Sequence, residues 1–136
     1  VVYAKYAMGP LAFGVSRSHI DSATSTGGVG INENKTLRTS GGIFTNDQMS
    51  VAYNVNDDLS VSFTRSVDTY EGRTDIILTS GVGVNESIDM TVNAYQAAYS
   101  MGAMSIKAYN MRVKNPGYNT GAADRSITEI AVGLAF

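Results

Sequence analysis

The turn signals of this chain are of two kinds, tight and long, and the two kinds alternate along the sequence. Three very tight turns, at 9–10, 56–58 and 102–103, each join two apolar runs in the manner of a β-hairpin. Long stretches rich in Gly, Ser, Thr, Asn and Asp separate the hairpins, at 21–47, 68–89 and 114–125. The sequence therefore predicts antiparallel strands in up-and-down order, with the three long connections at one end.

The expected strands alternate apolar and polar residues with a period of two, which places one kind of side chain on each face. They cover residues 1–8, 11–20, 48–55, 59–67, 90–101, 104–113 and 126–136. The phase of the alternation slips near Ala94 and Tyr95, which predicts either a β-bulge or a strand that starts at a different residue from 90. Strands of this kind are typical of an outer-membrane barrel, apolar outside and polar inside. A soluble β-sandwich produces the same alternation, so both architectures remain open.

Composition limits the other classes. The chain has 136 residues, a length that suits one domain or part of one. With 43% hydrophobic residues and a net charge of -2, its composition argues against disorder. It has no cysteine for a disulfide or a thiolate metal site, and its pI of about 5.2 gives no basic surface for nucleic acid. The abundance of Val, Ile, Thr and Tyr over Leu predicts an all-β chain. Because Val1 opens directly into a strand-like run, we expect a processed mature protein or a fragment.

The C-terminal third carries a resemblance to a known family. Residues 95–107 read as strand, glycine turn and next strand; a Gly/Asn/Asp-rich loop follows, and 128–136 form a closing strand that ends on Phe136. This stretch resembles the Gram-negative general diffusion porins, most closely those of alphaproteobacterial type, whereas residues 1–89 match only in hairpin rhythm. The closing strand resembles the signal that the barrel-assembly machinery reads, carried here by Ile130, Val132, Leu134 and Phe136.

The resemblance implies a homotrimer of water-filled transmembrane β-barrels in the outer membrane of a Gram-negative bacterium. Such a porin passes small hydrophilic solutes and ions by passive diffusion, has no enzymatic activity and no cofactor, and contacts outer-membrane lipid and lipopolysaccharide. Seven strands do not make an even-numbered barrel. We therefore expect residues 1–136 to be the C-terminal half of a larger barrel of sixteen strands. A complete small barrel would need an eighth strand from 36–45 or 74–84.

Alternation also predicts which residues would line a pore. Arg17 and Arg65 fall on the lipid side by strict alternation, where they either meet anionic headgroups or are turned inward by a bulge. Porins carry basic wall residues, so the resemblance favours an inward turn for at least one of them. The candidate pore-lining set is Tyr3, Lys5, Arg17, Ser60, Ser62, Thr64, Arg65, Ser105, Lys107, Tyr109 and Glu129.

No catalytic or metal-binding motif stands out. His19 is the only histidine, and its serine neighbours Ser16 and Ser18 are explained by the strand. The segment 81–84 lacks the lysine and helix start of a phosphate-binding loop. Oxygen ligands that calcium could use occur in the loops, but solvated loop charge is the better explanation for them: Asp57, Asp58, Asp68, Glu71, Asp75, Glu86 and Asp89. Beside a porin, two alternatives stay open, a small closed barrel that acts as an adhesin and a soluble β-sandwich that binds a ligand.

Overall fold

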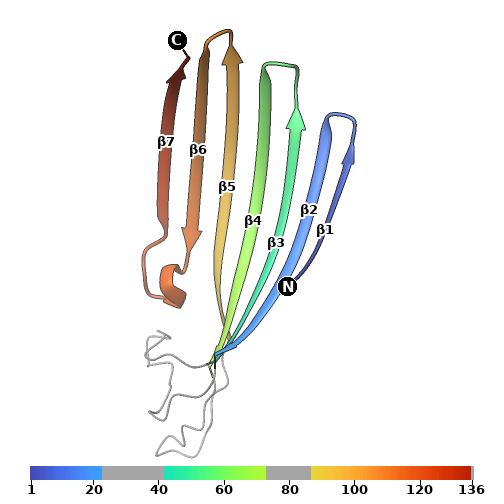
Figure 1. Ribbon diagram of the computed structural model, residues 1–136. Helices are drawn as coiled ribbons and strands as arrows, with labels where there is room; N and C mark the ends of the chain where they lie inside the picture. Colours follow the sequence, from blue (N-terminus) through green and yellow to red (C-terminus); the bar gives the residue numbers. More distant parts are fainter. Residues whose placement is uncertain (23–41, 73–86, 136) are drawn as a thin grey trace, which may run out of the picture.

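A computed structural model describes residues 1–22, 42–72 and 87–135, which form a single antiparallel sheet (Figure 1). Its elements are β1 (Val2–Met8), β2 (Leu11–Ser22), β3 (Gly42–Asn54), β4 (Leu59–Gly72), β5 (Ser87–Met101), β6 (Met104–Lys114), the 3₁₀ turn η1 (Pro116–Tyr118) and β7 (Arg125–Leu134). Each strand pairs with its neighbours in sequence, in the order β1 to β7. The predicted all-β class and up-and-down order are confirmed. In the described part of the chain, no helix is long and apolar enough to cross a membrane.

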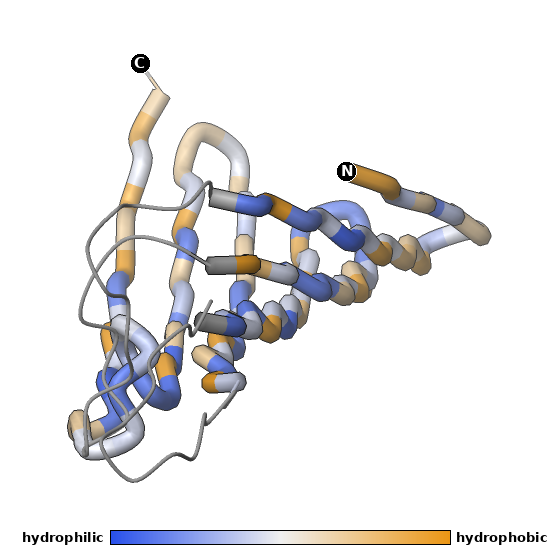
Figure 2. The backbone as a smooth tube through the Cα atoms, turned by 90° about the horizontal axis from the view of Figure 1, so that it is seen from below, coloured by the Kyte–Doolittle hydropathy of each residue, from blue (hydrophilic) through white to orange (hydrophobic). Residues whose placement is uncertain are grey.

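The sheet is open rather than closed. Within the described ranges β1 pairs with β2 alone and β7 pairs with β6 alone. Figure 2 looks along the strands and shows an arc whose two ends are these outer strands. Of the segments that could have supplied an eighth strand, residues 42–45 belong to β3, and 36–41 and 74–84 lie outside the described residues.

The three tight turns lie together at one end of the sheet, the turn end, as expected (Figure 1). Gly9 and Gly102 hold φ angles of +56° and +57°, which glycine adopts without steric penalty. In the remaining turn the Asn56 side-chain oxygen accepts hydrogen bonds from the backbone N–H groups of Asp58 and Leu59, at 2.9 and 2.8 Å. The opposite end of the sheet, the loop end, is where β2 stops and β3 begins.

Successive hairpins are staggered by a constant amount. Leu11 pairs with Tyr53, and the chain continues two residues beyond Tyr53 before it turns. Leu59 pairs with Tyr99, and β5 likewise continues two residues, to Met101. Each tight turn therefore reaches two residues further than the one before, a step that is visible in Figure 1. The stagger is thus one residue per strand. With a rise of about 3.4 Å per residue and about 4.8 Å between strands, a line through the tight turns is inclined by about 35° to the perpendicular of the strands.

The pairing is continuous through β5, so of the two alternatives near Ala94 and Tyr95 the bulge is wrong, and the strand does start earlier than expected, at Ser87. Ala94 pairs with Thr64 on one side, and Tyr95 pairs with Phe63. The phase slip in the sequence has another cause, an exchange of the apolar face along the strand. Tyr95 lies on one face near the turn end, whereas Ile88, an odd number of residues away, lies on the other face near the loop end, where it is buried.

Burial in the described residues is confined to the loop end. Tyr70 and Ile88 are the buried apolar side chains there, with 1% and 3% of their surface exposed. All residues of β1 and β7 are exposed. The strands also extend further toward the loop end than the alternation predicts, since β3 begins at Gly42 and β5 at Ser87. The turn-end half of the sheet has no packed core of its own.

Candidate functional site

The register assigns every strand residue to one of two faces, because residues paired across antiparallel strands point to the same side. We call the face that carries Phe13, Val51 and Tyr95 the apolar face. The opposite face, which carries Ser62, Gln96 and Lys107, is the polar face. Figure 2 shows the resulting alternation of hydrophobic and hydrophilic positions along the tube.

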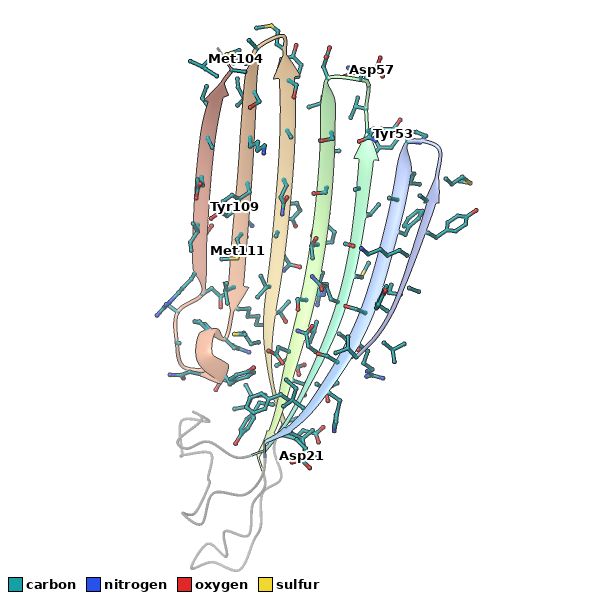
Figure 3. All side chains as sticks on the ribbon, in the orientation of Figure 1. Asp21, Tyr53, Asp57, Met104, Tyr109 and Met111 are labelled. Atoms are coloured by element: carbon teal, nitrogen blue, oxygen red, sulfur yellow. The ribbon has the colours of Figure 1, made fainter. Side chains whose placement is uncertain are left out.

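Nine of the eleven predicted pore-lining residues share the polar face: Tyr3, Lys5, Ser60, Ser62, Thr64, Ser105, Lys107, Tyr109 and Glu129. Tyr109 lies midway along β6 (Figure 3), where it pairs directly with Glu129 on β7. A hollow of about 560 Å³ lies against this part of the sheet, between β3 and β7. Its polar lining includes Ser60, Ser62, Gln96, Lys107, Tyr109 and Glu129.

Arg17 and Arg65 lie on the apolar face, so the predicted inward turn of at least one of them is wrong. No bulge interrupts β2 or β4, and strict alternation therefore holds for both arginines. Arg17 forms an ion pair with Asp47, its direct partner on β3, with the Nε to Oδ1 distance at 2.8 Å. Arg65 is exposed between Met49 and Asn93, its partners on the two neighbouring strands.

The residues of the predicted assembly signal lie on the apolar face of β7. Ile130, Val132 and Leu134 are 69%, 62% and 62% exposed, so none of them is packed into a protein core. Phe136, the last residue of that signal, lies outside the described residues.

An aromatic cluster covers the polar face at the loop end, and the sequence analysis missed it. Phe44, Tyr70 and Tyr118 bring their ring centroids within 4.9 to 5.7 Å of one another, Tyr118 from η1 and the others from β3 and β4. The sequence predicts the segment 114–125 only as a long polar connection. The available signal was the opposite phase of Phe44, Tyr70 and Ile88, relative to the apolar residues near the turn end of the same strands.

Tyr118 fixes η1 to the sheet by a hydrogen bond as well as by ring packing. Its hydroxyl donates to Asp68 at 2.8 Å, and the side-chain amide of Asn115 donates to the Asp89 carbonyl at 2.9 Å. Tyr118 has a φ of +57°, which is unfavourable for a bulky residue, so these contacts compensate local backbone strain. Burial, together with the neighbouring Asp68 carboxylate, raises the pKa of Tyr118. Burial also raises the pKa of Tyr70.

The polar groups do not form a catalytic arrangement around the single histidine. His19 Nδ1 lies 3.2 Å from Thr45 Oγ1 on the apolar face, whereas Ser16 and Ser18 lie on the polar face. Residues 1–22, 42–72 and 87–135 contain no group of three or more His, Asp or Glu side chains that could hold a metal ion. Asp75, Glu86 and the segment 81–84 lie outside those ranges.

Comparison of the chain with models of protein families, with curated proteins and with solved structures found no match.

Proposed function

We propose that this chain is part of an outer-membrane porin, in which the apolar face contacts lipid and the polar face lines a water-filled passage for small hydrophilic solutes and ions. The protein would be a channel without a cofactor, acting as a homotrimer that the barrel-assembly machinery inserts. The single observation that carries the proposal concerns the apolar residues of the apolar face that lie between the tight turns and the first polar position, which we call the apolar band. When the strands are tilted as in a transmembrane barrel, the two borders of this band become level.

The border of this band toward the loop end shifts from strand to strand by the same stagger as the tight turns. On β2 to β7 the last apolar residues before the polar stretch are Val15, Met49, Phe63, Tyr95, Ala108 and Ile130, which form three directly paired couples. Met49 pairs with Arg65, two residues beyond Phe63. Tyr95 pairs with Asn110, two residues beyond Ala108. The border therefore moves by about one residue per strand, although Val67 on β4 and Ile43 on β3 lie beyond it on the same face.

A slope of about 35° matches the strand tilt of about 35–45° in transmembrane barrels. With that tilt, the border and the tight turns both run parallel to a membrane plane. The enclosed band covers five positions on β2, β4 and β6 and seven on β3 and β5. At this tilt it is about 14–20 Å high, less than the roughly 25 Å of a typical barrel. The alternative of a soluble β-sandwich does not require the two borders to be parallel at this slope.

Aromatic residues support the same orientation. Tyr6, Tyr53 and Tyr99 each lie two residues from the turn-end limit of their hairpin, so the tilt that levels the border also brings these three tyrosines to one height. Figure 3 shows Tyr53 close to the turn of its hairpin. Tyrosine belts of this kind occupy the membrane interface, because the ring is apolar and the hydroxyl is wet.

The polar face is suited to an aqueous lumen because its turn-end half carries small and hydrophilic residues rather than a core. The charged side chains there are Lys5, Lys107 and Glu129. The β-sandwich alternative would need a second layer over the apolar face, and the described residues contain one sheet whose apolar face is exposed. The adhesin alternative differs from a porin only in having a plugged lumen.

The test is conductance of the full-length protein after reconstitution into a planar lipid bilayer. A porin should produce stepwise, ohmic current increments, and lipid vesicles that contain it should become permeable to small sugars. A protein that enters vesicles without conducting would support the closed adhesin. A protein that stays monomeric and soluble without detergent would overturn the membrane proposal and favour the sandwich.

A further inference from the structure

The apolar face carries basic side chains just above the border of the apolar band. Arg65 is the first charged residue beyond that border on β4, and Arg112 and Lys114 follow it on β6. Arg65 and Arg112 lie in the same row, each paired with Asn93 on the strand between them. Two strand spacings separate them, which is about 10 Å between Cα atoms. We call Arg65, Arg112 and Lys114 the basic patch.

The basic patch is exposed, and its cations form no ion pair with a described carboxylate. Arg65, Arg112 and Lys114 are all exposed. Across residues 1–22, 42–72 and 87–135 the ion pair is Arg17 with Asp47, and no carboxylate in those ranges lies within 4.0 Å of a patch cation. The carboxylate of Asp89, nearer the loop end, accepts a hydrogen bond from Thr69 instead. Asn93, between the arginines, adds a neutral hydrogen-bonding group.

We propose that the basic patch binds the phosphate groups of anionic lipid in the leaflet on the loop side of the membrane. This inference rests on the proposed function, because lipid reaches the patch only if the apolar face is the lipid face. The apolar band immediately below takes the acyl chains, and the cations above it meet the headgroup phosphates. Arg forms paired hydrogen bonds with phosphate, and each basic residue near a lipid surface attracts anionic lipid.

The height of the patch agrees with this occupant. When the strands are tilted by about 35°, Arg65 lies level with the first polar residues of the other strands. Arg112 then lies about 6 Å higher, since it is two residues beyond Asn110. Long arginine side chains reach upward from such a position into the headgroup layer while their stems stay in apolar surroundings. Cations here lie in the interfacial layer instead of the hydrocarbon centre, where an arginine costs about 2–4 kcal/mol.

The experiment compares two double variants of the full-length protein that lose equal charge from opposite faces. One is Arg65→Gln with Arg112→Gln, in the patch, and the other is Lys5→Gln with Lys107→Gln, on the polar face. Each protein is reconstituted in phosphatidylcholine vesicles with and without phosphatidylglycerol. Retained lipid is then counted by native mass spectrometry after extraction, and affinity is obtained by titrating phosphatidylglycerol. Inorganic phosphate alone serves as the soluble probe.

The wild type and the polar-face variant should retain phosphatidylglycerol over phosphatidylcholine, and the patch variant should bind it roughly tenfold to thirtyfold more weakly. The inference would be overturned if the patch variant retained as much phosphatidylglycerol as the wild type, or if both variants lost it equally. It would also be overturned if inorganic phosphate, at the same concentration as the lipid, bound the protein equally well. If the wild type enters vesicles and conducts yet shows no preference for anionic lipid, only this inference fails. If it does not enter vesicles, the proposed function fails with it.

Discussion

At the scale of single residues, side-chain charge has different consequences on the two faces of the sheet. Lys107 lies on the polar face, with Ala98 and Ala131 as its direct neighbours on β5 and β7. Small neighbours leave its ammonium group open to the solvent beside the hollow. Under the proposed function, a charge in this position acts on every ion that passes, because the lining charges of a pore set its ion preference.

Replacing Lys107 by Glu should therefore shift the reversal potential toward cation preference in a salt gradient across a planar bilayer. The matched control is Arg112→Glu, which makes the same change of charge on the apolar face and should leave the reversal potential unchanged. An equal shift in both variants, or none in Lys107→Glu, would remove Lys107 from the lumen wall.

At the scale of elements, sequence periodicity predicted the strands of the turn-end half but not their continuation. Near the tight turns each face of the sheet has a single environment, so the alternation is regular. The assignment of Ser62, Lys107 and Glu129 to the polar face follows from this alternation. Toward the loop end η1 packs on the polar face, and the apolar residues change sides to meet it. Tertiary packing by a turn some fifty residues away in sequence, from Tyr118 to Asp68, is not encoded in local periodicity.

The docking of η1 depends on Tyr118, which gives a prediction about local stability. Tyr118→Phe should lower the free energy of local opening by about 1.5 kcal/mol, since one hydrogen bond to a carboxylate is lost. Tyr118→Ala should lower it by about 2–3 kcal/mol, because the ring contacts of a half-buried side chain are lost too. Hydrogen exchange of the residue 118 amide, which donates to the Asn115 carbonyl at 3.0 Å, measures this opening. Tyr3→Ala, which removes an exposed tyrosine, should change nothing.

The same contact should depend on alkaline pH. Since the pKa of Tyr118 is raised above its usual value of 10.0, the folded state holds the phenol proton more tightly than the unfolded state. Stability from this group is therefore complete below pH 10.0 and falls as the pH rises above it. Tyr118→Phe should lose this dependence. Identical alkaline profiles for the two proteins would show that η1 does not rely on the neutral phenol.

At the scale of the whole molecule, the number of strands restricts how the sheet can close. Strands alternate in direction from β1 to β7, so the two outer strands run the same way. An all-antiparallel closure therefore requires an odd number of additional strands, and the total becomes even, as in bacterial barrels. One further strand, for a total of eight, and nine, for a total of sixteen, both satisfy this condition.

The two outer strands also give a test of closure that does not depend on conductance. In an open sheet, alternate amides of β1 and β7 have no partner strand and exchange with solvent quickly. Lipid supplies no hydrogen bonds, so a sheet that spans a membrane must pair these amides. In vesicles, the full-length protein should protect them as strongly as the amides of β4, which is paired on both sides. Fast exchange confined to alternate positions of β1 and β7, with β4 protected, would show that the sheet stays open and would contradict the barrel.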